Sequence, residues 1–591
     1  MPDNIIKIDS LIIILLAISG WLFSNAGSLK KNLHILQLED YEAGRMLRII
    51  FRQPRRMQLL GVELAAVPIV LIVIYLRRYL GFEFDPEWLN IADIYSARVL
   101  DFNWAPAWLI WGSGCFWRGW RTNKKIQSGK KPLVLTARAK RIQWVGFGLS
   151  IITVSLLIIV LTVVRYLNIS YREYASELYS LSVSWAGVFW ISVFVVMYIV
   201  ERASLLFLAV STAILKPFEF LIQKRYLDEA KSILTQIDPT VIGITGSYGK
   251  TGTKEILSAM LAEKYNVFRP PGSYNTVMGI TRVVRERMRP YHEVFVAEMG
   301  AYRIGSIERL CNFVKPKHGI ITTIGVQHLE RFKSRENIKK AKGELVRALS
   351  SDGIAVLNGD DQACREIGAQ FSGRVVYFSI EGTKSGNETL LISNISIGLY
   401  GSDFDITYPD GEKDSVHLSL LGRSAVSNAA AAVAMADSVG VPRKAIKRAL
   451  EALPHTKHRL EPLLWEGEIT VLDDAYNSNP IGARNALEVL SVATSGRRIL
   501  VTPGMIELGE LEDQANHEFG KQAAKACDLV VLVGIKRIEA IKKGLLDGGF
   551  DSSKIWAVSN LNDGLEKLKS YLKSGDTILL ENDLPDQYDG T

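Results

Sequence analysis

The uncharged apolar run from Val145 to Val164 constrains this chain more than any other feature of its sequence. A helix needs about 20 such residues to cross ~30 Å of hydrocarbon, and the buried helix of a soluble core seldom needs a run of that length. The run therefore predicts a membrane-spanning helix. Spans of this kind are predicted at 8–27, 58–76, 143–164 and 185–200, the last with an apolar continuation to 215.

Two basic loops predict the orientation of these spans, one between the first two runs and one at 118–142. Cytoplasmic loops carry the excess of Lys and Arg, so both loops should face the cytosol, which requires another crossing between them. The candidate is the Trp-rich run 103–117, which either spans the membrane or forms a re-entrant segment. If it instead lies flat on the membrane surface, the number of crossings changes by one. Five crossings predict a multi-pass protein of the inner (cytoplasmic) membrane, with the residues after 215 in the cytosol.

Composition narrows the alternatives. A chain of 591 residues is long enough for three or four domains, and its apolar residues crowd into the first 215 positions. The net charge of +8 lies largely in short loops between apolar runs, which favours a membrane-lipid partner and no nucleic acid. The first run is not a typical cleaved signal peptide, since Asp3 and Asp9 replace a basic leader. The four cysteines form no CxxC pair, as expected for a reducing cytosol.

From residue 226 the pattern changes to short β-branched strands alternating with amphipathic helices, which predicts an α/β fold with a mainly parallel sheet. Residues 241–256 read as a strand, a glycine-bearing turn and a helix start. This is the context of a phosphate-binding loop, whose backbone N–H groups and lysine meet phosphate oxygens and whose threonine reaches Mg²⁺. The general motif has glycine where this chain has Ile244. The expected ATP-binding residues of the loop are Gly246, Ser247, Gly249, Lys250, Thr251 and Gly252.

The variant Thr-Gly-Ser-x-Gly-Lys-Thr resembles the loop of the Mur ligases, especially of the MurF type, which adds D-Ala-D-Ala to a muramoyl tripeptide. Seven further motifs follow in the order of that family. They are Tyr274–Thr276 with Gly279, Val296–Gly300, Thr323–Leu329, Ala341–Glu344, Leu357–Asp361, His458–Glu461 and Asp473–Pro480. The resemblance implies a central parallel-sheet ATP-binding domain at 226–462 and a Rossmann-like C-terminal domain at 463–591, after an all-α membrane region at 1–225.

Two residues follow apolar strands and are expected to bind metal. Glu298 ends such a strand, so its carboxylate should project from the carboxyl edge of the sheet as a Mg²⁺ ligand beside Thr251. The resemblance makes His328, after the strand 319–324, a ligand of a second Mg²⁺. Taken alone, the glutamate is more often solvated, and the histidine is more often a helix cap or a packed side chain.

Lys342 is implied by the resemblance to react with CO₂ and to hold the second Mg²⁺ as a carbamate. The ordinary alternative is a surface lysine in a basic run, with a pKa near 10.4 that disfavours the reaction. Burial beside two metals would lower that pKa. The resemblance further implies ATP contacts by Asn275, by Asn358 at adenine, by Arg459 at the γ-phosphate, and by Asp474 between ribose and γ-phosphate. For Asn358 the alternative is an ordinary turn. For Arg459 it is a surface ion pair with Glu461.

The C-terminal part resembles MurF-type domains at 501–509 and His517, and its candidates for contact with the amine substrate are Tyr476, Asn477 and Asn479. The likeness ends at 580–586, where an acidic Leu-Glu-Asn-Asp-Leu-Pro-Asp replaces a Lys-Gly-Ser-Arg-like segment. Residues 1–225 likewise replace the soluble domain that holds the uridine nucleotide. Both departures leave the substrates open.

The expected reaction is ATP-dependent amide-bond formation through an acyl phosphate, catalysed by Lys250, Glu298, His328, Lys342, Arg459 and Asp474. The expected partners are ATP, two Mg²⁺ ions, a cell-wall peptide acceptor in UDP-linked or lipid-linked form, and an amino acid or dipeptide amine. This places the chain in peptidoglycan precursor synthesis. The alternatives are a membrane-associated poly-amino-acid synthetase and, in another class, a membrane scaffold that only binds ATP. An ATP-driven transporter is disfavoured because the chain lacks a second nucleotide-binding domain.

Overall fold

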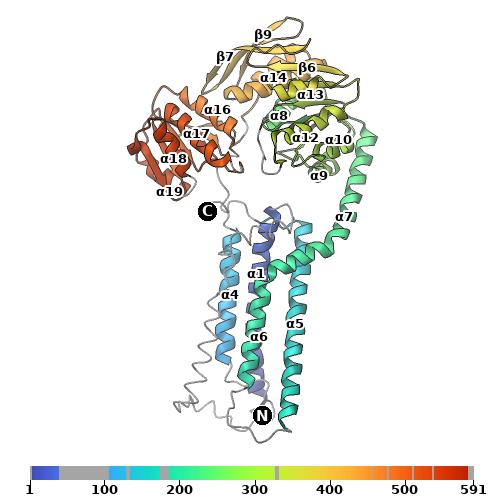
Figure 1. Ribbon diagram of the computed structural model, residues 1–591, viewed down its shortest axis with the longest axis vertical. Helices are drawn as coiled ribbons and strands as arrows, with labels where there is room; N and C mark the ends of the chain where they lie inside the picture. The colour runs from blue at the N-terminus through green and yellow to red at the C-terminus, as the bar shows by residue number, and fades with distance from the viewer. Residues whose placement is uncertain are drawn as a thin grey trace. The chain divides into compact units, whose positions relative to one another are not determined.

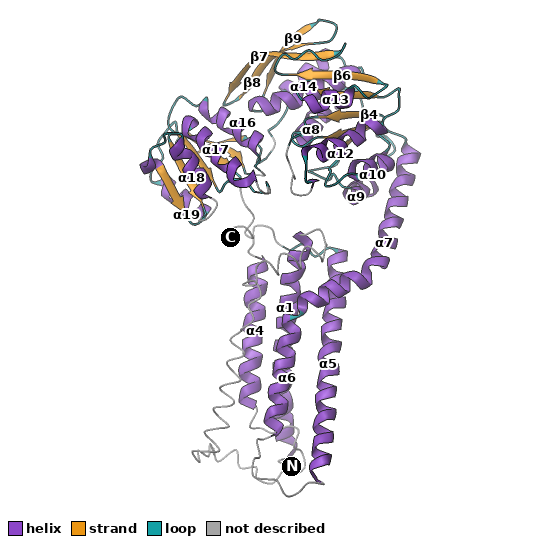
Figure 2. Cartoon of the chain, viewed as in Figure 1, coloured by secondary structure: helices purple, strands orange, loops and turns teal. Residues whose placement is uncertain are grey.

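The computed structural model describes residues 3–38, 105–127, 133–173, 185–325, 332–455, 457–475, 478–506, 508, 511–534 and 538–582. These residues form two compact units, Met1–Ile222 and Gln223–Thr591 (Figure 1). The described part of the first unit is helical, whereas the second contains two β-sheets with helices around them (Figure 2). The boundary between the units falls close to the change of pattern seen at residue 226 of the sequence.

The described residues of the first unit include the long helices α1 (Asp3–Leu38), α4 (Ala105–Gln127), α5 (Ala137–Glu173), α6 (Trp185–Arg202) and the start of α7 (Ser204–Ile237). Among the described residues, Ala137–Val164 and Ser204–Ile237 are long and apolar enough to cross a membrane. The first of these contains the predicted span 143–164. The predicted span 58–76 lies outside the described residues, and the count of five crossings stays a prediction.

The sequence treated residues up to 215 as a continuation of the span 185–200. The structure instead ends α6 at Arg202 and starts α7 at Ser204, with a turn at Ala203. The new helix runs on past Pro217 to Ile237. The predicted span 185–200 thus lies within α6, and its apolar continuation to 215 lies mostly in α7.

Small residues bring α1 and α4 together. A Cβ atom on Gly20 would lie 2.4 Å from the Gly112 carbonyl oxygen, and one on Gly112 would lie 2.6 Å from the Ala17 Cα atom. Backbones can approach this closely only where side chains are absent or very small. Above the contact, the Arg118 guanidinium forms a 2.6 Å ion pair with Glu201, and Ser24 donates to the same carboxylate at 2.9 Å. Glycine contacts and a buried polar network thus fix how these helices pack.

The middle domain of the second unit is built on a nine-stranded sheet in the order β2-β3-β1-β4-β5-β6-β7-β8-β9. The strands from β2 to β7 run parallel, and β8 and β9 extend the sheet as antiparallel strands. The bounds are β1 Thr240–Thr245, β2 Val267–Phe268, β3 Val294–Glu298, β4 His318–Ile321, β5 Ile354–Asn358, β6 Arg374–Ser379, β7 Thr389–Gly398, β8 Gly401–Thr407 and β9 Lys413–Leu418.

Helices cover this sheet around two separate apolar cores (Figure 1). One core packs α8 (Lys250–Ala262), α14 (Gly422–Ser438) and α15 (Arg443–Glu451) against the strands. The other packs the end of α7 with α9 (Val277–Arg287), α10 (Ser306–Val314), α12 (Arg335–Ala348) and α13 (Gln362–Gly368). Strands covered on both faces are typical of parallel sheets and explain their nearly continuous apolar runs. The predicted α/β class is confirmed.

The C-terminal domain has a six-stranded sheet in the order β10-β11-β15-β12-β13-β14, with β10 antiparallel to β11 and the other neighbours parallel. Its strands are β10 Glu461–Trp465, β11 Ile469–Asp474, β12 Arg498–Thr502, β13 Leu529–Val533, β14 Ile555–Val558 and β15 Thr577–Glu581. Its helices are α16 Pro480–Ser491, α17 Glu512–Ala526, α18 Ile538–Asp547 and α19 Leu561–Lys569. Open sheets of this kind bind ligands at the carboxyl ends of their strands.

Candidate active site

The loop between β1 and α8 has the backbone geometry of a phosphate cradle. A Cβ atom on Gly246 would lie 1.9 Å from the Thr322 Oγ1 atom, so only glycine fits there. Gly249 has a φ of +82° and directly precedes α8, and a Cβ atom on it would lie 2.2 Å from the Asn428 Oδ1 atom. Left-handed backbone before a helix turns successive N–H groups toward one point, where they can bind an anion. The predicted loop therefore has the backbone geometry that an anion site needs.

Lys250 is buried within this loop. Its Nζ atom donates to the carbonyl oxygens of Gly246 at 2.7 Å and Ser247 at 3.1 Å. Burial lowers the pKa of Lys250 to about 8, Glu298 opposes that shift, and the positive charge of Arg459 adds to it. An ammonium group held in so little solvent gains strongly from an anionic ligand.

Glu298 lies at the centre of the polar contacts at the end of β3 and is 1% exposed. Its Oε2 atom accepts from the Thr251 hydroxyl at 3.0 Å, and its Oε1 atom accepts from the Asn275 amide at 3.0 Å. A carboxylate beside a hydroxyl at the end of a phosphate loop matches the oxygen ligands that Mg²⁺ prefers. The structure thus brings together three residues that the sequence predicted separately.

Lys254 also contacts Glu298, although the sequence analysis missed it. Its Nζ atom lies 3.5 Å from Glu298 Oε2 and also donates to the Gly272 carbonyl oxygen. Burial lowers the pKa of Lys254, and Glu298 opposes the shift. The available signal was its position four residues after Lys250, which places both lysines on one face of α8.

Lys342 lies on α12 and is 4% exposed, so the reading of it as a surface lysine is wrong. Burial lowers its pKa well below the ordinary value, and the positive charge of Lys250 lowers it further. That interaction places Lys342 within electrostatic range of the phosphate loop. Burial therefore favours the neutral amine of Lys342, which is the form that reacts with CO₂.

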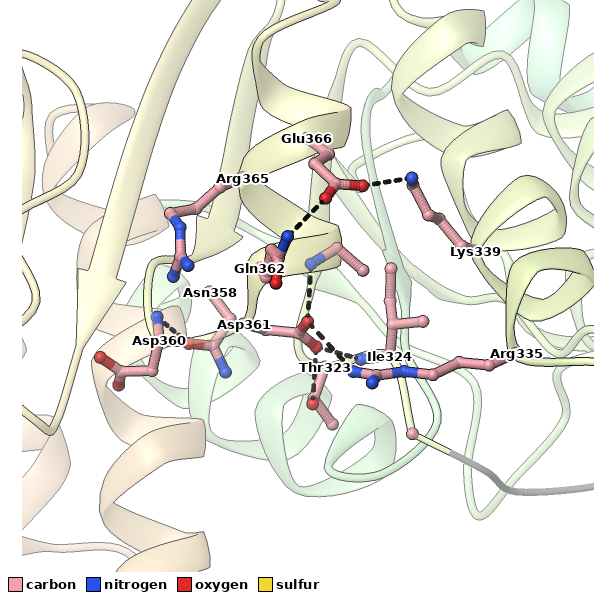
Figure 3. Close-up of polar contacts among 12 residues, drawn as sticks. Thr323, Ile324, Arg335, Lys339, Asn358, Asp360, Asp361, Gln362, Arg365 and Glu366 are labelled. Carbon is pink, nitrogen blue, oxygen red and sulfur yellow. Dashed lines mark hydrogen bonds and ion pairs between the residues drawn. The ribbon is translucent and has the colours of Figure 1, made fainter.

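Asp361 fixes the loop that follows β4 (Figure 3). Its Oδ2 atom accepts from the Ile324 N–H at 2.6 Å and the Thr323 hydroxyl at 3.1 Å, while its Oδ1 atom caps α13 at Ala363. Thr323 and Ile324 are thereby held directly before the segment 326–331. His328 lies in that segment, outside the described residues, so its role as a metal ligand stays a prediction.

The Asn358 side chain bonds to the ends of neighbouring segments (Figure 3). Its amide donates to the Thr322 carbonyl oxygen at 2.9 Å and accepts from the Asp360 N–H at 2.9 Å. These contacts are those of an ordered turn at the carboxyl edge of the sheet. The predicted contact with adenine is not tested by them.

Asp474 and Arg459 come from the C-terminal side of the site. The Asp474 Oδ1 atom accepts from the Leu460 N–H at 3.2 Å, and burial raises the pKa of Asp474 to about 6. The charge of Arg459 favours ionisation of Asp474 and disfavours protonation of Lys250. Arg459 therefore lies within electrostatic range of both Lys250 and Asp474.

The three amine-substrate candidates have different outcomes. Tyr476 and Asn477 lie outside the described residues. Asn479 caps α16, because its side-chain oxygen accepts from the N–H groups of Ile481 at 3.2 Å and Gly482 at 2.9 Å. An N-cap of this kind accounts for the asparagine without any substrate contact, since capping alone favours this residue type.

Asn428 on α14 is a second residue that the sequence analysis missed. A Cβ atom on Gly252 would lie 2.6 Å from its Nδ2 atom, and Thr253 donates to its Oδ1 atom at 3.3 Å. It therefore lies against the phosphate loop and the first turn of α8. An asparagine directly before a run of alanines on a buried helix was the available signal, because a buried amide needs polar partners.

The residues present fit both ATP and Mg²⁺. The glycine cradle and Lys250 suit phosphate oxygens, while Thr251 and Glu298 suit a divalent cation. Within the described part of the chain, no three His, Cys, Asp or Glu side chains gather closely enough to hold a metal. A bound ion would therefore complete its coordination with phosphate oxygens or water, as is usual for Mg²⁺.

Comparisons with known proteins agree with this geometry. The family model of the Mur ligase middle domain matches residues 244–436, and that of the Mur ligase, glutamate ligase domain, matches residues 458–581. The UDP-N-acetylmuramoyl-tripeptide--D-alanyl-D-alanine ligase of Bacillus subtilis (strain 168) is 30% identical over 354 residues, which are 60% of this chain and 75% of that enzyme.

Solved structures give the same result. A crystal structure of MurF from Acinetobacter baumannii is 28% identical with a TM-score of 0.54, covering 61% of this chain and 77% of that one. MurF ligase from Thermotoga maritima in complex with ADP is 27% identical with a TM-score of 0.54, covering 61% of this chain and 80% of that one. The chain therefore belongs to the Mur ligase family, is MurF-like in its middle and C-terminal domains, and is an ATP-dependent ligase that forms amide bonds.

Proposed function

We propose that this enzyme joins an amine to a substrate carboxylate through an acyl phosphate, and that its carboxylate acceptor is held at a membrane. The observation that carries the reaction is the convergence of Lys250, Thr251, Glu298 and Lys342 on one phosphate-binding loop. The membrane setting is supported by two described helices that are long and apolar enough to span a bilayer. They belong to a helical unit that stands where MurF-type ligases carry a uridine-nucleotide domain.

ATP supplies the phosphoryl group, which passes to the substrate carboxylate and leaves ADP. The amine then attacks the acyl carbon, the C–N bond forms, and inorganic phosphate leaves. In this chain the loop N–H groups, Lys250 and Arg459 neutralise phosphate charge, while Thr251 and Glu298 are the residues that would hold Mg²⁺. Such a reaction depends mainly on positioning and charge neutralisation, so it needs no protein nucleophile.

Lys342 is proposed to carry a carbamate that helps hold a second Mg²⁺. Its neutral amine would add to CO₂ and release one proton, which converts a buried cation into an anion. The lowered pKa of Lys342 supports this step, and its nearness to Lys250 supplies a charge that stabilises the product. Lys342→Ala should abolish activity and regain part of it with added short carboxylates, whereas undiminished activity without rescue would refute the carbamate.

The acceptor is best identified by offering the full chain, in detergent, two forms of one substrate. A UDP-linked muramoyl tripeptide and its lipid-linked counterpart present the same carboxylate on different carriers. With ATP and mixed amino acids present, mass spectrometry of the products should show amide formation on the lipid-linked form. Exclusive use of the UDP-linked form would refute a membrane-held acceptor, and a polymer of a single amino acid would identify a poly-amino-acid synthetase instead.

A further inference from the structure

The linker that enters the C-terminal domain holds Arg459 between two residues with left-handed backbone. His458 has a φ of +59° and Leu460 has a φ of +47°. Residues other than glycine adopt this conformation at a cost, because the Cβ atom crowds the following carbonyl oxygen. Such a cost persists only where the surrounding contacts enforce it, and it is commonly found at functional sites. The left-handed residues on either side of Arg459 therefore need an explanation in the contacts around them.

Carboxylates of the C-terminal sheet enforce this conformation. The His458 Nδ1 atom lies 2.8 Å from the Asp473 Oδ2 atom, and the His458 N–H donates to Glu461 Oε2 at 3.1 Å. The Leu460 N–H donates to Asp474 Oδ1 at 3.2 Å. Glu461 and Asp473 are themselves register partners in the antiparallel pair of β10 and β11. Both left-handed residues are thus bonded to these two strands.

Burial anchors the same segment. Leu460 is 7% exposed and packs in the apolar core of the C-terminal domain, as does Leu472 of β11. Asp473 is 8% exposed, and its Oδ1 atom also accepts from the Ala475 N–H at 3.1 Å. A buried carboxylate with both oxygens bonded has little freedom to move, so it fixes the imidazole that it contacts. Arg459 is consequently fastened to the C-terminal sheet through both of its neighbours.

The arginine held in this way lies within range of the phosphate loop. Arg459 acts electrostatically on Lys250 and Lys254 of α8, and it acts on Asp474 as well. A guanidinium that meets a phosphoryl group in transfer gains from being held in place, because it then needs no reorganisation at the moment of reaction. A stiff linker on both sides of Arg459 supplies that restraint.

We propose that His458 is a positioning residue for Arg459, and that its imidazole, held by Asp473, keeps the linker in the conformation that aims the guanidinium at the transferred phosphoryl group. Leu460 holds the other side of the arginine by its bond to Asp474 and by its buried side chain. His458 touches no reacting atom and acts only through its neighbour. The inference rests on the phosphoryl transfer proposed above.

Substitutions of His458 separate the side-chain bond from the backbone conformation. His458→Asn keeps both, because asparagine tolerates left-handed backbone and its amide can take the place of the Nδ1 atom. His458→Gly keeps only the conformation, and His458→Ala keeps neither. The kcat for ADP release should fall in that order, with the asparagine variant near the wild type and the alanine variant lower by about tenfold or more. KM for ATP should stay within about twofold throughout, since aim matters most in the transition state.

Lys457→Ala is the matched control, because this exposed lysine directly precedes His458 in the linker. The assays use the full chain in detergent with the UDP-linked and lipid-linked acceptors and the amino-acid mixture named above. The His458 side chain is 58% exposed, so its replacement leaves the core intact, and thermal unfolding of each variant verifies this. A His458→Ala variant with the kcat of the control would overturn the proposal.

A double-mutant cycle decides whether His458 acts through Arg459. Arg459→Ala alone should lower kcat by about 100-fold or more, because a charge that stabilises the phosphoryl transition state is lost. With Arg459 already replaced, His458→Ala should lower kcat by no more than about twofold further, since a positioning residue then has nothing to position. If the two losses instead multiplied, His458 would act independently of Arg459 and the proposal would be wrong.

Trapping with hydroxylamine separates this inference from the proposed reaction. An acyl phosphate formed from ATP and the acceptor, without an amine, gives a hydroxamate. The expected result is a hydroxamate in the wild type and in Lys457→Ala that is much reduced in His458→Ala. Absence of hydroxamate in the wild type would refute the acyl phosphate, while the cycle on ADP release would still decide the link between His458 and Arg459.

Discussion

The phosphate loop and the carboxyl edge of the C-terminal sheet are built with opposite charges. Around the loop, Lys250, Lys254 and Lys342 are buried with Glu298 between the first two. At the other edge, the half-buried Asp474 is paired in register with the buried Glu581, and Arg459 acts electrostatically on both Asp474 and Lys250. A buried surplus of one sign is costly unless a ligand of the other sign completes it. The lysines of the first region suit an anionic ligand, whereas the carboxyls of the second reduce their repulsion by taking up protons more readily.

The largest expected effect tests the cationic side of this comparison. Lys250→Ala should lower kcat for ADP release by about 10³-fold, because a buried ammonium that neutralises phosphate charge is removed. Coupled ADP measurement with saturating acceptor and amine gives the rate. Lys444→Ala, at an exposed position of α15, is the control and should keep the wild-type rate. A loss below tenfold would break the assignment of Lys250 to the phosphates.

The next effect concerns the shape of the cradle and not its charge. Gly246→Ala should lower the free energy of unfolding by about 1–3 kcal/mol and weaken ATP binding, since its Cβ atom would collide with the Thr322 hydroxyl. Thermal unfolding with and without ATP measures both. The double variant with Thr322→Ala removes the colliding atom and should recover part of the stability. No recovery would show that backbone conformation, and not this contact, requires the glycine.

A smaller effect is expected from Lys254 and Glu298, the oppositely charged side chains beside the phosphate loop. Lys254→Met keeps an apolar stem but removes the ammonium beside Glu298, so the carboxylate should be less well placed to hold Mg²⁺. The apparent affinity for Mg²⁺ in the ADP-release assay should fall about tenfold. Lys264→Met, on an exposed side chain just after the same helix, should not change it. An unchanged Mg²⁺ dependence in Lys254→Met would limit Lys254 to packing.

The smallest effect is a pH dependence of stability from the acidic region. The pKa of Asp474 is raised to about 6 in the folded protein from an ordinary 3.8, so ionisation disfavours folding. Its contribution to stability is fully present below its unfolded pKa and is lost as pH rises through about 6. The difference in Tm between the wild type and Asp474→Asn should therefore change between pH 5 and pH 7, in the wild type's favour at the lower pH. A constant difference would mean that Asp474 ionises freely.

The sequence predicted the site residues that lie close to one another along the chain or directly at the end of a strand. Gly246, Gly249, Lys250 and Thr251 lie together because a strand, a turn and a helix follow one another directly. Glu298 was predictable because the end of a buried strand meets the same sheet edge. Local order also identified Asn479 as a residue of interest, but its role in the structure is to cap α16.

Residues that act across the fold were not predictable in this way. Asn428 reaches the phosphate loop from α14, more than 170 positions away along the chain. Lys254 is recognisable only once Gly272 and Glu298 are known to face it. These features depend on tertiary packing, which the apolar pattern of one segment does not encode.

Helix α14 contacts both the phosphate loop and the C-terminal domain. At its first turn the Ser424 N–H donates to the Asn485 side chain of α16 at 2.9 Å. Further along the helix, the Asn428 side chain lies against the phosphate loop. A helix transmits displacement along its axis as a nearly rigid rod, because interiors are densely packed. Any adjustment of the loop to a nucleotide is thereby carried to α16, directly after the segment between Asp474 and the cap at Asn479. We therefore expect ATP to bind before the amine, because the bound nucleotide would position the C-terminal domain that meets the amine.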